Sequence, residues 1–443
     1  MTPIPRRQFV EHVAAGVAFT VVPRHVLGRG FRAPSDTLNV ACIGVGGMGW
    51  TDVRGVAGEN VVALCDVDTD RAEQAFAAHL QAKRFTDFRV MLEREAAGID
   101  AVTISTPDHV HAAVAMMALK AGKHVYCQKP LARTLGEVRA LMAESSRRPR
   151  QATQMGNQGH AGEGTRQIRE WVEAGAIGTV REVQYWTNRP IWPQAIDRPT
   201  EAHHPPPTLA WDLWLGPAAD RPYHPAYAPF RWRGWWDFGT GALGDIACHA
   251  MDAAFWVLEL KYPSRIEPES TQLYQETAPR ASRILYRFPA RSGRPEVTLV
   301  WRDGGIIPPR PPEVPAEAPW PPHQDGGQLW IGDDGKLVAG MYGQNPHLLD
   351  ADRQADLMAS PPPVKYPRVD SVYAEWIAAC KAGTQAGSSF AGHAGPLTEV
   401  VLLGNLALRA NRALTLNAET GAITNGAVPA DWIMPPYRRG WTM

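Results

Sequence analysis

The chain has 443 residues, of which 44% are hydrophobic and 20% are charged, and its formal net charge at pH 7 is zero. This length suggests two domains with large cores. The balanced charge gives no reason to expect nucleic acid as a partner, and no apolar segment is long enough to be a stable membrane anchor. The five cysteines and the scattered histidines lack ligand spacing, so neither a disulfide framework nor a metal site is predicted.

Residues 1–35 are predicted to form an export signal and linker. The pair Arg6–Arg7 precedes a short apolar segment, residues 13–22, which Pro23 ends. This order resembles a twin-arginine signal, although Pro5 stands where Ser or Thr is usual and no clean Ala-x-Ala cleavage site follows. The alternative is an N-terminal extension without a signal function. Because the twin-arginine route carries folded proteins, an exported or periplasmic enzyme could leave with its cofactor bound.

Residues 36–155 are predicted to form a nucleotide-binding domain. The apolar run 38–43 leads into a G-x-G-x-x-G sequence and then into a helix-compatible segment. This is the context in which glycines bind a dinucleotide: the first permits a tight turn, the second admits the pyrophosphate and the third allows close helix–strand packing. The predicted loop residues are Gly44, Gly46, Gly47, Met48 and Gly49.

A second strand, residues 61–65, ends in Asp66. A carboxylate there suits the ribose hydroxyls of NAD and disfavours the 2′-phosphate of NADP. Arg71 lies close enough to leave NADP open, and the alternative role of Asp66 is that of a turn residue.

Strands and helices then continue to alternate. Helices are predicted over residues 71–83, 110–121 and 135–146, and strands over 101–105 and 124–127. Repeated βα units predict a doubly wound parallel sheet, and ligands bind such sheets at the carboxyl ends of the strands. The polar residues at those ends are Thr106, Pro107, His111, Gln128 and Lys129.

Residues 156–415 are predicted to form a second α/β domain, followed by a tail, 416–443, that returns to the body of the protein. In the second domain, Asp245 and His249 lie four residues apart after a glycine-rich run. If a helix begins near Asp245, the carboxylate and the imidazole share one face. In most proteins such an aspartate caps the helix and such a histidine is a packing residue. The alternative is that the carboxylate orients a histidine that accepts a proton.

These features together resemble the glucose–fructose oxidoreductase, inositol dehydrogenase and MocA (Gfo/Idh/MocA) family over roughly residues 37–415. The resemblance rests on the glycine loop, Asp66, Thr106–Pro107 with His111, Lys129–Pro130, and Asp245 with His249. It implies a Rossmann domain, then an α/β domain with an open, mostly antiparallel sheet, and a homo-oligomer. One position departs from the family pattern, because Gln128 stands where such proteins commonly have Glu.

The resemblance implies an oxidoreductase that moves a hydride between a sugar hydroxyl and tightly bound NAD. Lys129, Asp245 and His249 would surround that hydroxyl, and which of them takes the proton stays open. Aromatic and polar residues suited to a carbohydrate occur nearby, although each could instead be a packing residue. The substrate-binding candidates are Asn157, His160, Arg189, Arg233, Trp235 and Trp236.

Two other functions remain open at this point. Some relatives use NAD transiently, oxidising a sugar at C3 and eliminating the glycosidic substituent, and the same three residues would serve such a glycosidase or lyase. A non-catalytic sugar- or nucleotide-binding protein is the alternative from another class. Retention of Lys129, Asp245 and His249 favours an enzyme.

Overall fold

The computed structural model describes residues 36–443 except 202 and 292. Both β-sheets belong to one compact unit, Asn39–Met443. The predicted export signal at Arg6 and Arg7 lies outside the described residues, so export stays a prediction. In the part of the chain that is described, no helix is both long and apolar enough to cross a bilayer.

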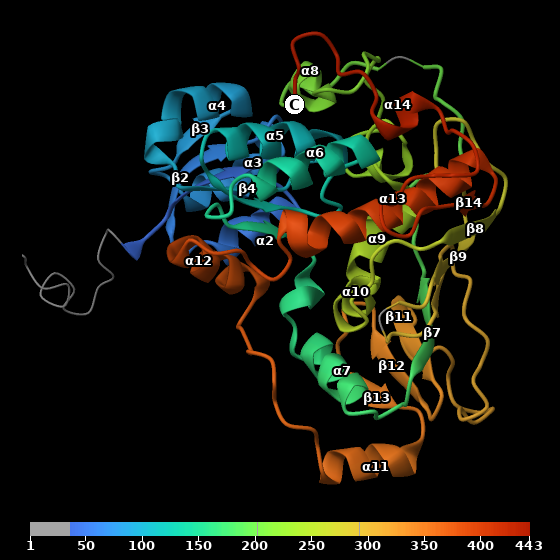
Figure 1. The fold of residues 1–443 in the computed structure, drawn as a ribbon. Helices are drawn as coiled ribbons and strands as arrows, with labels where there is room; N and C mark the ends of the chain where they lie inside the picture. Colours follow the sequence, from blue (N-terminus) through green and yellow to red (C-terminus); the bar gives the residue numbers. More distant parts are fainter. Residues whose placement is uncertain (1–35, 202, 292) are drawn as a thin grey trace, which may run out of the picture. The chain divides into compact units, whose positions relative to one another are not determined.

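The first sheet has six parallel strands in the order β3-β2-β1-β4-β5-β6 (Figure 1). This confirms the predicted doubly wound sheet. Strand β1 lies in the middle, and its last residue, Ile43, pairs with both Cys65 and Ile104. The carboxyl ends of three strands therefore meet at one edge. The strands are β1 Asn39–Ile43, β2 Asn60–Cys65, β3 Lys83–Phe85, β4 Ala101–Ile104, β5 His124–Cys127 and β6 Thr153–Met155.

Helices connect these strands, and local capping signals fix several of their ends. Asp68 caps α3 by accepting from the N–H groups of Asp70 and Arg71, and α6 begins with a capping box of Thr134 and Glu137. The helices are α2 Met48–Gly55, α3 Thr69–Ala78, α4 Phe88–Glu95, α5 Asp108–Lys120 and α6 Leu135–Ser146, with the 3₁₀ turn η2 at Ala96–Gly98. The helix predicted over 71–83 is too long, because Lys83 already begins β3.

The second sheet has eight strands in the order β13-β12-β11-β7-β10-β9-β8-β14, all antiparallel except the pair β7–β10. This confirms the expected open, mostly antiparallel sheet. In Figure 1 the green strand β7 lies beside the orange strand β11, which pairs on its other side with β12. The strands are β7 Val180–Thr187, β8 Arg265–Ser270, β9 Ser282–Phe288, β10 Val297–Arg302, β11 Gly326–Gly332, β12 Lys336–Gly340, β13 His347–Leu348 and β14 Leu414–Thr415.

The remaining helices join the two sheets through one hydrophobic core that extends from Ala41 to Trp441. The longest, α13, is buried along most of its length and ends at Asn411, which adopts the left-handed conformation (φ 48°) typical of a helix C-cap. The α-helices are α7 Glu163–Glu173, α8 Trp211–Leu215, α9 Gly241–Ala250, α10 Asp252–Val257, α11 Ala351–Ala359, α12 Val372–Ala382, α13 Gly395–Ala410 and α14 Ala430–Ile433. The 3₁₀ turns are η3 Gln158–Ala161 and η4 Arg231–Gly234, and η5, Phe390–Ala394, is a turn of π-helix.

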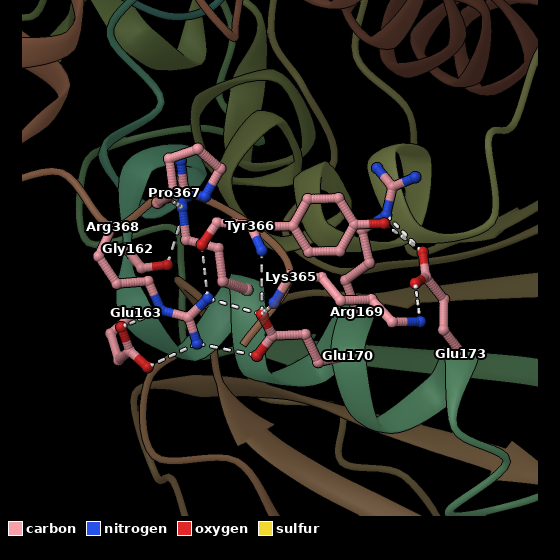
Figure 2. Close-up of polar contacts among 10 residues, drawn as sticks. Gly162, Glu163, Arg169, Glu170, Glu173, Lys365, Tyr366, Pro367 and Arg368 are labelled. Carbon is pink, nitrogen blue, oxygen red and sulfur yellow. Dashed lines mark hydrogen bonds and ion pairs between the residues drawn. The ribbon is translucent and has the colours of Figure 1, made fainter. Parts of the chain in front are cut away.

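The segment between α11 and α12 is bound to the surface of α7 by a set of ion pairs (Figure 2). Arg368 forms two hydrogen bonds with Glu163, at 2.7 and 3.0 Å, and two with Glu170, at 2.7 and 2.8 Å. The hydroxyl of Tyr366 donates to Glu173. We call residues 365–368 the α7 strap.

The last segment of the chain returns to the first sheet. The guanidinium of Arg89, on α4, donates to the carbonyl of Gly440 at 3.1 Å and lies 4.0 Å from the ring of Trp441. Phe88 also contacts that ring, with 5.9 Å between ring centroids. Both sheets share one compact unit, so the domain boundaries at residues 155 and 415 stay predictions.

Candidate active site

The glycine loop between β1 and α2 leaves no room for larger residues. Gly44 has a φ of +75°, and a Cβ at this position would lie 2.7 Å from the backbone carbonyl of Ser105. A Cβ on Gly49 would lie 2.0 Å from the carbonyl oxygen of Gly44. The turn and the close helix–strand packing therefore require glycine at both positions.

Asp66 lies at the mouth of this loop, at the end of β2. Its Oδ2 accepts hydrogen bonds from the backbone N–H groups of Val45 (2.8 Å) and Gly46 (3.2 Å). Burial raises the pKa of this carboxyl above its usual value, against the opposing effect of these hydrogen bonds. Arg71 lies against the same loop, since a Cβ on Gly47 would lie 2.8 Å from its Nη2.

One cavity of about 540 Å³ extends from this loop to the ends of β4 and β5. Its volume falls within the range of small-molecule and cofactor sites, roughly 300–1,000 Å³. The predicted residues in its lining are Gly44, Gly46, Gly47, Met48, Asp66, Thr106, Pro107, Gln128, Lys129, Arg233 and Asp245.

Two features of the cavity wall fit a bound dinucleotide. The hydroxyl of Thr106 is buried without a hydrogen-bond partner among the described residues, so it is available to a ligand. His111 does not line the cavity, but it lies between two segments that do: its Nδ1 lies 2.8 Å from the carbonyl oxygen of Pro130 and its Nε2 lies 2.9 Å from that of Thr106. We interpret His111 as a positioning residue for these two strand ends.

Lys129, Asp245 and Arg233 form a charged group at the far end of the cavity, in which Asp245 is buried and the two cations are partly buried. The Nζ of Lys129 donates to the Oδ1 of Asp245 at 2.9 Å and to its backbone carbonyl at 2.8 Å. The Nε of Arg233 donates to the same Oδ1 at 3.1 Å. Burial alone would raise the pKa of Asp245, but the two cations hold it well below its usual range. Asp245 is therefore an anion.

His249 lies one turn beyond Asp245 on α9, as the spacing predicts, because this helix begins at Gly241. Among the described residues, the hydrogen-bond partners of the Asp245 carboxylate are Lys129 and Arg233, so it does not hold His249. The Nδ1 of His249 is buried and has no hydrogen-bond partner in the described part of the chain, and the centroid of its ring lies 4.7 Å from that of Tyr342. Burial, and then the charge of Lys129, lower its pKa to about 3. The imidazole is neutral at pH 7.

Gln128 binds a second buried acid, which explains the departure from the family pattern. Its Nε2 lies 3.0 Å from both carboxylate oxygens of Asp52. Asp52 also accepts from the hydroxyls of Ser105 (2.5 Å) and Tyr373 (2.6 Å). Burial raises the pKa of Asp52 to about 6. A glutamate at position 128 would place a second carboxylate beside that of Asp52. The amide of Gln128 instead donates a hydrogen bond to the Asp52 carboxylate.

Five of the predicted substrate-binding residues do not line the cavity. The ring of Trp235 is fully buried and donates to the carbonyl of Ala226, and Trp236 is buried beside Arg409. Both are packing residues. The side chain of Arg189 donates to Asn188 at 2.5 Å. Asn157 and His160 bind Asp252 instead.

Several residues that line the cavity were not predicted from the sequence. Phe230 and Trp232 lie beside Arg233 in the lining, on the segment that precedes α9. Asp108 also lines it and accepts from the hydroxyl of Thr240 at 2.8 Å. At the other end, Trp441 contributes to the wall. Trp232 adjoins predicted residues and could have been found, but no local signal marks Trp441.

Comparison with known proteins agrees with this architecture. Residues 38–155 match a family model described as an oxidoreductase family with an NAD-binding Rossmann fold. Residues 165–292 match the model of the C-terminal α/β domain of the same family. Together the two matches cover more than half of the chain.

Curated relatives match 32–40% of this chain. Inositol 2-dehydrogenase 1 of Saccharopolyspora erythraea is 35% identical over 146 residues, 32% of this chain and 43% of that protein. Inositol 2-dehydrogenase 3 of the same organism is 30% identical over 185 residues, 40% of this chain and 54% of that protein. The chain thus matches about half the length of these relatives.

Solved structures show the same fold across both sheets. The WlbA dehydrogenase of Bordetella pertussis, in complex with NADH and UDP-GlcNAcA, aligns with a TM-score of 0.58 at 16% identity, over 86% of this chain and 99% of that one. Levoglucosan dehydrogenase, in complex with NADH and levoglucosan, aligns with a TM-score of 0.57 at 18% identity over the same shares. The chain belongs to the Gfo/Idh/MocA oxidoreductase family, with that family's NAD-binding Rossmann fold and C-terminal α/β domain.

Proposed function

We propose that the protein is an NAD-dependent dehydrogenase that oxidises a hydroxyl group of a carbohydrate or cyclitol. The observation that carries this proposal is the single cavity that connects the glycine loop and Asp66 with Lys129, Asp245 and Arg233. The residues expected to bind a dinucleotide and the charged group thus line the same cavity. The relatives that are inositol 2-dehydrogenases, and the fold shared with levoglucosan dehydrogenase, support this substrate class.

Lys129 is the residue that we expect to contact the reacting hydroxyl. An ammonium group has three N–H donors, and two of those on Lys129 are used by Asp245. The third is available to an oxygen atom in the cavity. A fixed cation at that point stabilises negative charge that develops on the oxygen as its proton leaves. When bound there, NAD supplies the nicotinamide ring that accepts the hydride.

Proton transfer needs a base beside this cation. Asp245 is a weak base because it already balances the charges of Lys129 and Arg233. His249, with a pKa of about 3, is also a weak base and does not line the cavity, but it is neutral and its Nδ1 has no protein partner among the described residues. We propose that Asp245 fixes the position of Lys129, and that His249 accepts or relays the proton.

The coenzyme is proposed to be NAD and to bind tightly. The Asp66 carboxylate at the end of β2 favours two free ribose hydroxyls, while Arg71 is the residue that could admit a 2′-phosphate. Trp441, packed between Arg89 and Phe88, closes one end of the cavity. Phe230 and Trp232 offer ring faces to the apolar side of a sugar at the other end.

A first experiment tests the coenzyme and the reaction together. Protein purified without added coenzyme is denatured, and the released nucleotide is identified by mass spectrometry. The protein is then assayed for NADH formation with inositols, anhydrosugars and methyl glycosides. Protein that releases no nicotinamide nucleotide, and also shows no affinity for added NAD(H) or NADP(H), would refute the proposal.

Variants then test the assigned residues. Lys129→Met and His249→Gln should lower turnover by roughly 100-fold or more, the range for loss of an electrostatic or acid–base group. NADH binding, measured by fluorescence titration, should persist. Lys261→Met is the matched control, because this exposed lysine lies outside the cavity lining. His249 itself does not line the cavity, so unchanged turnover in both variants would leave Lys129 and His249 with packing roles.

An aryl glycoside separates net oxidation from glycoside cleavage. A dehydrogenase should give the keto-glycoside with one NADH for each product molecule. Release of the phenol without accumulation of NADH would instead identify the glycosidase or lyase reaction, in which the hydride returns to the sugar.

A further inference from the structure

Asn157, His160, Asp252 and His393 meet at one buried point outside the cavity. The Oδ1 of Asp252 lies 2.5 Å from the Nδ2 of Asn157, 3.0 Å from the Nδ1 of His160 and 2.6 Å from the Nε2 of His393. Three of these side chains, those of Asn157, His160 and Asp252, belong to buried residues, and that of His393 is 11% exposed. They come from the segment of η3, from the first residue of α10 and from the π-helical turn η5.

Hydrogen bonding alone accounts poorly for this arrangement. Three nitrogen atoms lie within 3.0 Å of one carboxylate oxygen, which has about two lone pairs, and the Nδ1 of His160 also lies 3.2 Å from the second oxygen. Meanwhile the Oδ1 of Asn157, fully buried, has no partner among the described residues. A rotation of this amide by half a turn would replace its N–H₂ group with that oxygen, directed at the same point.

The charges point in the same direction. The rings of His160 and His393 lie 4.4 Å apart, too close for both to be imidazolium cations without repulsion. When both imidazoles are neutral, their two nitrogens, one carboxylate and one amide oxygen form a set of four donors of the kind that binds a borderline divalent metal. The ligand atoms of His160, Asp252 and His393 all lie within 4.8 Å of one another. Ligands of a tetrahedral zinc ion are separated by about 3.3 Å, so movements of the order of 1 Å convert one arrangement to the other.

The surroundings resemble the outer shell of a metal site. A Cβ on Gly387 would lie 2.8 Å from the Oε1 of Glu375 and 2.9 Å from the Nε2 of His160, so a carboxylate lies near the ring nitrogen that Asp252 does not use. Metal-binding histidines commonly have such a partner for their second nitrogen. The π-helical turn that carries His393 is a rare conformation that occurs frequently at functional sites.

We propose that His160, Asp252 and His393, together with the Oδ1 of Asn157, bind a divalent transition-metal ion, with zinc as the best match. The ion would tie η3 and η5 to α10, which follows the helix that carries Asp245 and His249. This site is separate from the cavity, so it does not depend on the proposed dehydrogenase activity.

Metal content provides the direct test. The full-length protein is treated with a chelator, desalted, incubated with a slight excess of ZnCl₂ and desalted again, and the retained metal is measured by mass spectrometry. We expect about one zinc ion per chain and a higher thermal unfolding midpoint than in the metal-free protein. A cobalt-loaded sample should show the visible bands of a four-coordinate ion.

Variants assign the ligands. His393→Gln and Asp252→Asn should each lose retained zinc and the cobalt bands. His224→Gln is the matched control, since it removes one ring of another close pair, His203 and His224, whose centroids lie 4.7 Å apart. Wild-type protein that retains no zinc or cobalt, and whose unfolding midpoint is unchanged by either, would overturn the proposal without recourse to any variant. Retention of the ion in both ligand variants would overturn it equally.

Discussion

Replacement of Gln128 by glutamate, the residue common in the family, should destabilise this protein in a pH-dependent way. The amide of Gln128 lies 3.0 Å from both oxygens of the buried Asp52 carboxylate. Gln128→Glu removes this donor and sets a second acid in its place. Two unit charges about 4 Å apart repel by roughly 4 kcal/mol at the effective dielectric constant of protein sites.

Proton uptake limits this repulsion. Burial already raises the pKa of Asp52 from 3.8 to about 6, and a neighbouring carboxylate raises the pKa of the pair further. At about pH 7.5, protonation of a group with a pKa near 6 costs about 2 kcal/mol, at 1.36 kcal/mol per pH unit. We therefore expect Gln128→Glu to lower the free energy of unfolding by about 2 kcal/mol at that pH and by less in mild acid.

The sign follows from proton binding. The folded variant holds a proton that the unfolded chain releases near its ordinary carboxyl pKa, so its stability is greatest at low pH and declines as the pH rises through the folded-state pKa. Urea unfolding midpoints, measured from about pH 5 to about pH 8, give the dependence. Gln128→Met is the control, because it removes the donor without adding a charge. Parallel curves for the two variants would refute this electrostatic account.

Two further changes test regions outside the charged pocket. Trp441→Ala should weaken NADH binding about 5- to 30-fold, which corresponds to roughly 1–2 kcal/mol of lost aromatic contact. The control is Thr442→Ala, which changes an exposed neighbour and should leave NADH binding unaltered. Equal affinities of the two variants in a fluorescence titration would show that Trp441 does not contact the nucleotide. Arg368→Met should release the α7 strap, seen as faster proteolysis between α11 and α12. The hydrogen bonds from Arg368 lower the pKa of Glu170 from 4.5 to about 2. Their contribution to stability is therefore present above pH 4.5 and is lost as the pH falls toward 2. An acid-unfolding midpoint that is the same in Arg368→Met and in the wild type would contradict this reasoning.

The nucleotide-binding part was predictable because its signals are local. The bounds of α6 agree with the predicted 135–146, since Thr134 and Glu137 mark its start. The glycine loop and Asp66 follow strands whose apolar runs are continuous. Strand β3 was missed because its three residues, Lys83–Phe85, carry no apolar pattern and the first two are exposed.

The second sheet depends on contacts between distant residues. Strand β7 pairs with β10 and β11, more than 100 residues further along the chain, and nothing local specifies that order. In the site, Lys129 and Asp245 could be paired from motif order. Trp235 and Trp236 were assigned by their nearness to Arg233 in sequence, yet their rings are buried away from the cavity that it lines.

The contact of Trp441 with the nucleotide cavity has a consequence for biosynthesis. Arg89 and Gly440, which the tail brings together, are 351 residues apart. At ribosomal rates of roughly 5–20 residues per second, the tail follows Arg89 by about 20–70 s. During that interval the nascent Rossmann sheet can form while its coenzyme pocket still lacks one wall. Tight retention of the coenzyme would then be a property acquired late in synthesis, after the sheet that binds it has formed.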